Sequence, residues 1–478
     1  MSAADRAMPG SPSPSLRRRL VKGSAWVLIG RVISIVLGVG INALLARLLT
    51  PTELGAYFTT FTMVIVGAVI AQLGLDRALV KVAAAAIGVG EPGRARDAIR
   101  RCLSIGAATA VVAGLALSFV VGPALAEHVF HSAVVEAAMP LAGGWLIATA
   151  LQSLMVETFR GLQDFGRATL YDALLVDILV ATTLGIIFTS GAVAIDIRGA
   201  VAIAGGVTFL VLLLGARHLR REIGAISGEG SLQRHEIFDI AWPSLVTNVA
   251  IYFLGSGVDL LVLGAFRPQS DVALYGAATR LVTLVATPLW IIRGVMPPIV
   301  AELHAKGQRR QLEDTLRAGA SLAGLPSLAI LVVFVVFGAS VMEIIYSPFY
   351  RQGSTILVIL SIGRLFAVWA GAAGITLMMT GHQRSMMVVT LATGALSVTA
   401  GIIAADRYGA VGVAAATASV AVLQNLLQVA LARRFVGVWT FVQLSPRKLR
   451  DFFLRGDIRS FLQRRRASPV DEPPDLEA

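Results

Sequence analysis

Long apolar stretches, separated by short polar loops, run along almost the whole chain. The first extends from Ala25 to Leu49 and exceeds the roughly 20 residues that an α-helix needs to cross a bilayer. It follows a cationic flank and ends at a Thr50-Pro51 turn, after which the next apolar stretch begins. The pattern predicts twelve membrane-spanning helices, at residues 24–49, 57–80, 102–126, 137–159, 169–190, 196–217, 239–266, 272–300, 318–344, 353–380, 386–405 and 409–433.

The two halves of the chain share a weak sequence repeat. Ala25-Trp26 matches Ala241-Trp242, and three further pairs of segments match in the same order at offsets between 210 and 220 residues. If each half holds six spans, both halves start on the same side of the membrane, so the repeats are parallel. The predicted fold class is therefore an all-α polytopic membrane protein whose twelve transmembrane helices form two pseudo-symmetric six-helix bundles.

Composition supports this class and removes others. The chain is 56% hydrophobic and 15% charged, with a mean hydropathy of +0.76. Its net charge of +12 would suit a nucleic-acid partner, but the positions of the basic residues favour a different explanation. With the N-terminus in the cytoplasm, 32 Lys and Arg residues fall on the cytoplasmic side and five on the outer side. This asymmetry is typical of membrane proteins; it predicts a multi-pass membrane protein with both termini cytoplasmic and no nucleic-acid partner.

Polar stretches set the expected domain boundaries. They predict five parts, namely a disordered basic tail at 1–22, a bundle at 23–217, a cytoplasmic linker at 218–238, a second bundle at 239–435 and a basic tail at 436–478. In the last part, apolar residues between Leu454 and Leu462 share one helical face and Arg residues occupy the others. This suits a helix lying at the lipid headgroups, and a solvated basic tail is the alternative.

Few residue patterns point to catalysis. Cys102 is the only cysteine, so neither an intramolecular disulfide nor a cysteine-based metal site is expected. The sequence lacks a glycine-rich phosphate loop with a lysine, and it lacks a cluster of residues with metal-ligand spacing. We therefore predict no enzyme activity, no catalytic residues, no metal site and no cofactor.

The chemistry that remains is carried by ionisable residues inside the spans. Placing an arginine at the bilayer centre costs at least about 2.5–3.5 kcal/mol unless it faces water or a partner. Arg293 lies near a span end, where its side chain can reach the headgroups. Two asparagines lie on polar helix faces, where tight helix packing is the alternative role. The predicted residues of a substrate cavity are Arg31, Asn42, Asn248, Arg280 and Arg364.

Acidic residues are scarce at membrane depth. Asp177, in the fifth predicted span, is the acid nearest the bilayer midplane. It is expected either to form an ion pair with an arginine or to bind a coupling H⁺ or Na⁺. Because fixed cations outnumber anions in the spans, the predicted cavity suits an anionic substrate.

Several segments resemble polysaccharide-biosynthesis flippases of the multidrug/oligosaccharidyl-lipid/polysaccharide (MOP) exporter superfamily. They are GSAWVLIGRVISIVLGVGINALLARLLTPTELGAY, AQLGLDRALVK, ALYGAATRL and LMMTGHQRS, and the likeness covers roughly residues 20 to 435. The resemblance implies a V-shaped pair of bundles with a central cavity lined by spans 1, 2, 7 and 8. It also implies a cationic cavity, and Arg31 and Arg280 lie on the implied lining spans, whereas Arg364 lies on a less central one.

The resemblance implies a function as well. Such proteins flip undecaprenyl-diphosphate-linked oligosaccharides from the cytoplasmic to the periplasmic leaflet for O-antigen, capsule or exopolysaccharide synthesis. Expected partners are the lipid-linked anionic oligosaccharide, the bilayer, polysaccharide polymerases and glycosyltransferases, with H⁺ or Na⁺ coupling. One alternative is a cation-coupled antiporter of drugs or metabolites from the same superfamily. Another is a membrane scaffold that gathers polysaccharide-assembly enzymes and transports nothing.

Overall fold

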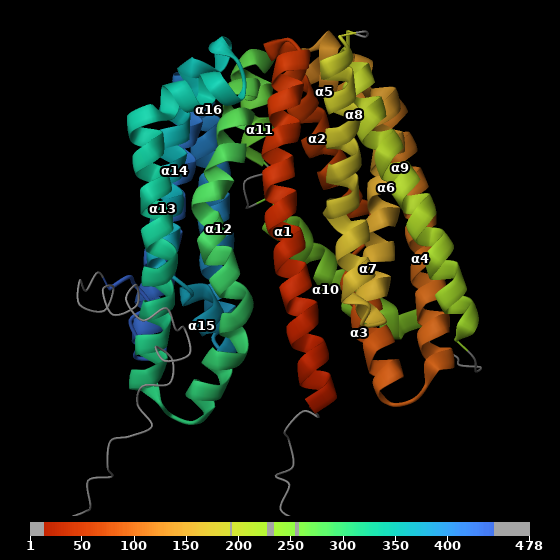
Figure 1. The fold of residues 1–478 in the computed structure, drawn as a ribbon, viewed down its shortest axis with the longest axis vertical. Helices are drawn as coiled ribbons and strands as arrows, with labels where there is room; N and C mark the ends of the chain where they lie inside the picture. The colour runs from red at the N-terminus through yellow and green to blue at the C-terminus, as the bar shows by residue number, and fades with distance from the viewer. Residues whose placement is uncertain (1–13, 192–193, 227–233, 254–257, 444–478) are drawn as a thin grey trace, which may run out of the picture.

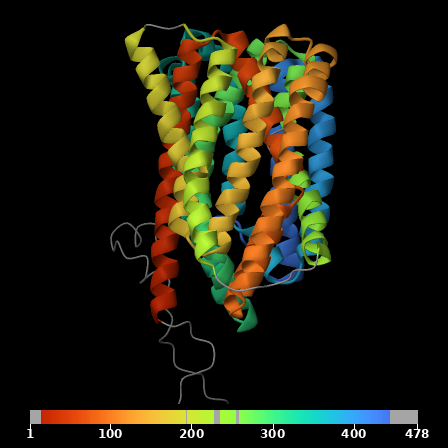
Figure 2. The ribbon, with the colours of Figure 1, turned by 90° about the vertical axis from the view of Figure 1, so that its right-hand side faces the viewer.

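The computed structural model describes residues 14–191, 194–226, 234–253 and 258–443, which are almost wholly helical and contain no strand. The long helices run side by side along the long axis of the molecule (Figure 1), and Figure 2 shows the same arrangement from the side. The predicted N-terminal tail up to residue 13, part of the predicted linker and the predicted tail helix near residue 458 lie outside the described residues.

The helices fall into two groups that follow the order of the chain. The first lobe consists of α1 (Pro14–Leu48), α2 (Pro51–Ala71), α3 (Leu75–Gly88), α4 (Pro92–Ala116), η1 (Leu117–Val121), α5 (Gly122–His128), α6 (Ala133–Gly161), α7 (Phe165–Thr169), η2 (Leu170–Leu174), α8 (Leu175–Ser190) and α9 (Ile197–Ala225). The second lobe consists of α10 (Arg234–Phe253), α11 (Val258–Phe266), α12 (Gln269–Ala305), α13 (Arg309–Ile345), η3 (Pro348–Gly353), α14 (Ser354–Ala370), α15 (Ala373–Met379) and α16 (Gln383–Phe435).

The number of membrane crossings agrees with the prediction. Ten helical segments of the described chain are long and apolar enough to cross a membrane. One of them, α16, changes direction at Gly409, where φ is +62°, and so contains the eleventh and twelfth predicted spans. The stretch predicted as the seventh span is occupied by α10 and α11 together. The all-α polytopic fold is thereby confirmed.

The second predicted span, 57–80, differs from the structure at both ends. Helix α2 begins earlier, at Pro51, because Thr50 and Glu53 cap its first turn. The Thr50 backbone N–H donates to the Glu53 carboxylate at 2.9 Å, and the Glu53 N–H donates to the Thr50 hydroxyl at 3.3 Å. This reciprocal pair satisfies two N–H groups that have no partner within the helix. The helix also ends earlier, at Ala71, and a turn at 72–74 leads into α3.

The lobes meet differently at the two ends of the molecule. We call the end at which α1 begins the proximal side and the end at which α1 finishes, at Leu48, the distal side (Figure 1). On the distal side one apolar cluster runs through both lobes and includes Leu54 and Phe58 of α2 with Tyr275 of α12. The distal halves of the lobes therefore share a continuous core, which close side-chain packing holds together within the bilayer.

On the proximal side, one element of the second lobe crosses to the first. Ile237 and Ala241 of α10 are buried in a cluster with Leu75 and Leu79 of α3. A Cβ atom on Gly74, just before α3, would lie 2.1 Å from the carbonyl oxygen of Ala241, so glycine permits this close approach. Helix α10 thus packs on the first lobe, although the sequence repeat assigns it to the second.

Candidate functional site between the lobes

Arg31 of α1 reaches across the boundary between the lobes. Its guanidinium carbon lies 4.4 Å from the centre of the Trp290 ring on α12. A cation over an indole face is attracted by the ring's negative face, by about 0.5–2 kcal/mol depending on exposure. The Arg31 side chain is exposed, so the aromatic ring orients the guanidinium while leaving its N–H donors accessible.

Arg280 of α12 reaches across in the opposite direction. Its guanidinium carbon lies 5.2 Å from the ring centre of Phe61 and 5.8 Å from that of Phe58, both on α2. These phenylalanines are three residues apart, so they lie on the same helix face. Each lobe therefore contributes one arginine that stacks on aromatic rings of the other lobe. Within the described residues, no carboxylate lies within 4.0 Å of either guanidinium.

Asp177 of α8 lies near Arg280. It accepts a side-chain hydrogen bond from Ser34 of α1 and interacts electrostatically with Arg280. Asp177 and Arg280 each also interact electrostatically with Tyr57 of α2. The structure thus brings together Asp177 and one arginine from the predicted cavity set, although the described ion pairs do not join them directly.

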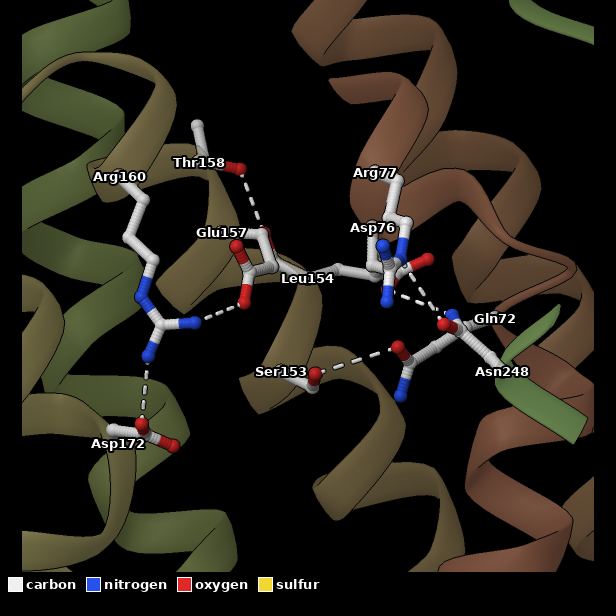
Figure 3. A network of polar contacts seen from close by, with 10 residues as sticks. All are labelled: Gln72, Asp76, Arg77, Ser153, Leu154, Glu157, Thr158, Arg160, Asp172 and Asn248. Carbon is white, nitrogen blue, oxygen red and sulfur yellow. Dashed lines mark hydrogen bonds and ion pairs between the residues drawn. The ribbon is translucent and has the colours of Figure 1, made fainter. Parts of the chain in front are cut away.

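Asn42 and Asn248 both form hydrogen bonds with other groups of the protein. Asn42 is 7% exposed, and its amide donates to the carbonyl oxygen of Gly38 in its own helix. Asn248 of α10 donates to a carboxylate oxygen of Asp76 at 2.9 Å and accepts from the Arg77 Nε at 3.1 Å. Figure 3 shows these contacts joining α10 to α3. In this state Asn248 links the lobes on the proximal side.

A second polar group lies in the same view. In Figure 3, Arg160 contacts Glu157 and donates to the Asp172 carboxylate at 2.8 Å. Between the two groups, Ser153 donates to the side-chain oxygen of Gln72 at 3.3 Å. Arg77 and Arg160 thus already donate to side-chain oxygens of the protein, so they are poorer candidates for binding an anion than Arg31 and Arg280.

Arg364 of α14 lies apart from the other two predicted arginines. Its electrostatic neighbours are Asp259 of α11, Tyr275 of α12 and Arg293. Asp259 is 8% exposed and accepts a hydrogen bond from the Tyr275 hydroxyl at 2.8 Å. Arg364 therefore belongs to a polar group inside the second lobe rather than to the interface pair.

The distal side is closed by contacts between the lobes. The Thr59 hydroxyl donates to the side-chain oxygen of Gln269 at 2.9 Å in a buried position. A Cβ atom on Gly55 would lie 1.7 Å from the Gln269 carbonyl oxygen, so α2 and α12 touch there through backbone atoms. Arg47, in the last turn of α1, donates to the carbonyl oxygens of Tyr346 and Ile344 at the end of α13.

Sequence reasoning missed the aromatic partners and the buried acid. Phe58, Phe61 and Trp290 occur in apolar stretches, where aromatic residues ordinarily pack in a core. Asp259 was not singled out as a site residue, because one acid in an apolar stretch does not reveal its hydrogen bond with Tyr275. The one usable signal was the spacing of Phe58 and Phe61 directly after a capped helix start. Across the described residues, no group of three or more His, Cys, Asp or Glu is placed to hold a metal ion.

Comparisons with known proteins agree with this architecture. Residues 44–355 match the family described as polysaccharide biosynthesis protein. No curated protein sequence matches the chain significantly. An inward-facing multidrug resistance MATE family transporter of the MOP superfamily superposes with a TM-score of 0.70 at 15% identity, over 84% of this chain and 94% of the other.

Two further solved structures are similar. The lipid II flippase MurJ, in an inward closed conformation, superposes with a TM-score of 0.66 at 14% identity, over 85% of this chain and 87% of the other. An outward-facing MATE family transporter gives a TM-score of 0.59 at 17% identity, over 88% and 95%. At these identities the likeness concerns the fold. The family match shows that this multi-pass membrane protein belongs to the polysaccharide biosynthesis protein family, and its fold is similar to that of the MOP superfamily transporters.

Proposed function

We propose that the protein flips undecaprenyl-diphosphate-linked oligosaccharides across the bacterial inner membrane by alternating access. The observation that carries this proposal is the pair Arg31 and Arg280. They come from opposite lobes, and each stacks on an aromatic ring of the other lobe. Guanidinium groups bind phosphate oxygens through two parallel hydrogen bonds. A diphosphate between the lobes receives such a fork from each side, and the undecaprenyl chain stays in the bilayer.

Aromatic rings suit this task better than carboxylates do. A carboxylate partner would compete with the diphosphate for the same N–H donors, whereas a ring face leaves the edge of the guanidinium free. Asp177 lies within electrostatic range of Arg280, so it tempers the positive charge without occupying the fork. This arrangement favours binding that is strong enough to select an anion and weak enough to release it.

The closed distal side and the distribution of charge support the proposed direction of transport. The 32-to-5 asymmetry of basic residues makes the proximal side cytoplasmic. Thr59, Gln269 and Arg47 close the distal side. The better superposition on an inward-facing than on an outward-facing transporter supports a state that accepts substrate from the cytoplasm.

The sugars of the substrate bind to polar side chains that become accessible only when the lobes move. Asn248 meets sugar hydroxyls after its link to Asp76 and Arg77 separates. Asn42 is buried in this state and becomes available only in another. Polysaccharide polymerases and glycosyltransferases are the partners that such a substrate requires.

A second candidate function is a cation-coupled antiporter of drugs or metabolites. Asp177 favours it, because a carboxyl group hydrogen-bonded by Ser34 in the membrane interior is suited to exchange a proton or Na⁺. Depletion of the protein in cells separates the two functions. If the protein is a flippase, its depletion should make lipid-linked oligosaccharide accumulate on the cytoplasmic leaflet. Normal export in depleted cells that express the Asp177→Asn variant would show that flipping does not require this acid. Unchanged oligosaccharide levels, with loss of drug resistance, would favour the antiporter.

A further inference from the structure

The chain continues beyond its last helix as a segment that packs into the proximal end of the second lobe. We call residues 436–443 the strap. Val438 and Thr440 of the strap are fully buried. Val436 and Val438 join an apolar cluster with residues of α12 and α13, such as Val300 and Leu316. A solvated tail would bury neither apolar nor hydroxyl side chains to this extent, so the strap is part of the lobe.

The strap completes the end of α14. Three consecutive carbonyl oxygens there, of Trp369, Ala370 and Gly371, accept from three separate donors. These donors are the Val442 N–H at 2.8 Å, the Thr440 hydroxyl at 2.8 Å and the Arg293 guanidinium at 3.3 Å. The last carbonyls of an α-helix have no donor within the helix, and leaving them buried without one is costly.

Two arginines lie near this helix end. Arg364 lies in the last two turns of α14, and Arg293 donates to the carbonyl that follows them. The two guanidinium groups interact electrostatically, and in the described chain neither has a carboxylate within 4.0 Å. The Arg293 Nε is also buried without a hydrogen-bond partner. Neighbouring like charges with unused donors are stabilised when an anion binds between them.

Other strap contacts serve only to anchor it. The Gln443 backbone N–H and carbonyl both bond to the Ser321 hydroxyl of α13, at 3.1 and 3.0 Å. The Trp439 N–H donates to the Glu313 carboxylate at 3.2 Å. These contacts reach α13 and leave α14 untouched, so they supply a matched control.

We propose that the strap positions Arg364, together with Arg293, to receive a phosphate oxygen of the substrate. Thr440 is a positioning residue in this account, because it touches the end of α14 and not the anion. The inference rests on the proposed diphosphate-linked substrate. It adds a second cationic site inside the second lobe, separate from the interface pair Arg31 and Arg280.

The test measures the affinity of the purified full-length protein in detergent for inorganic diphosphate, by titration calorimetry. We expect Arg364→Gln and Thr440→Val each to weaken binding about fivefold, the order of one net hydrogen bond. The double variant should bind no more weakly than Arg364→Gln alone, because both changes remove the same contribution. Thr440→Ser and Ser321→Ala should keep the wild-type affinity. If Thr440→Val does not fold, Thr440→Ala provides the same comparison.

Each other outcome has a definite meaning. If Thr440→Val weakens binding equally in wild-type and Arg364→Gln backgrounds, the strap is merely structural and the proposal is wrong. If Arg31→Gln abolishes binding while Arg364→Gln has no effect, the strap proposal fails and the proposed function stands. If the wild type does not bind diphosphate, both fail.

Discussion

The guanidinium carbon of Arg31 lies 4.4 Å above the Trp290 ring, and this contact joins the first helix of one lobe to the second lobe. Arg280 makes the reciprocal contact with Phe61. Both contacts must break or slide when the lobes rotate apart. The arginines therefore report the conformational state of the protein as well as offering donors to an anion.

Removing the aromatic ring that contacts Arg31 should slow flipping without lowering the abundance of the protein in the membrane. Trp290→Leu deletes an interaction of about 0.5–2 kcal/mol, so we expect flipping to fall by several-fold. Trp290→Phe keeps a ring face and should retain most activity. Trp242→Leu, at an exposed position of α10, is the matched control. Equal activity in all three variants, at equal abundance, would contradict a role for the ring.

The contact at Gly55 predicts a shift in conformational equilibrium. Its Cβ position lies 1.7 Å from the Gln269 carbonyl oxygen, so Gly55→Ala should force the distal ends of α2 and α12 apart. In a Cys102→Ser background, Thr59→Cys then becomes accessible to an impermeant maleimide applied from the distal side. Gly40→Ala, whose Cβ meets nothing within 4 Å, serves as the control. Identical labelling of Thr59→Cys in both backgrounds would show that this contact does not hold the distal side closed.

The link between Asn248 and Asp76 predicts coupled effects on stability. Each partner left alone loses a hydrogen bond of about 1 kcal/mol, so Asn248→Ala and Asp76→Ala should each lower the thermal midpoint in detergent. The double variant should lie close to the single ones, because residues in direct contact are not additive. Additive losses would indicate that the two side chains act independently.

The proposed orientation is tested by labelling from each side of the membrane. Cysteines introduced one at a time near residue 90 and near residue 307 should react only from the cytoplasm. A cysteine at 268, between α11 and α12, should react only from the periplasm. Arg351, which pairs with Glu343 at 2.9 Å near the distal end, marks the same outer side. Reaction of position 90 from the periplasm would reverse the assignment.

The sequence alone was sufficient to predict the membrane spans and to single out two residues that lie between the lobes. Apolar stretches of bilayer length are a local signal, and an arginine within one is conspicuous because burial of an unpaired charge is costly. Arg31 and Arg280 were found on that ground, and the structure places both between the lobes. The helix start at Pro51 was missed, although the Thr50 and Glu53 spacing is a recognisable capping signal.

Contacts between distant parts of the chain could not be predicted in the same way. The contact of Asn248 with Asp76 was not predicted, because a polar helix face does not reveal that α10 packs on α3. Residues from 436 onward looked like a tail, because the eight residues of the strap carry too little periodicity to show that Thr440 is buried. Such partners are set by tertiary packing, which local pattern does not contain.

The most direct measurement of the central claim is flipping of a lipid-diphosphate oligosaccharide by the purified protein in liposomes, with Arg31 and Arg280 each changed to Lys and Ala. Lysine keeps the charge but loses the two-pronged fork, so the account predicts rates in the order wild type, Lys, Ala. Arg351→Ala, remote from the interface, should match wild type. Wild-type rates in both alanine variants, at equal reconstituted amounts, would contradict binding of the diphosphate by these arginines.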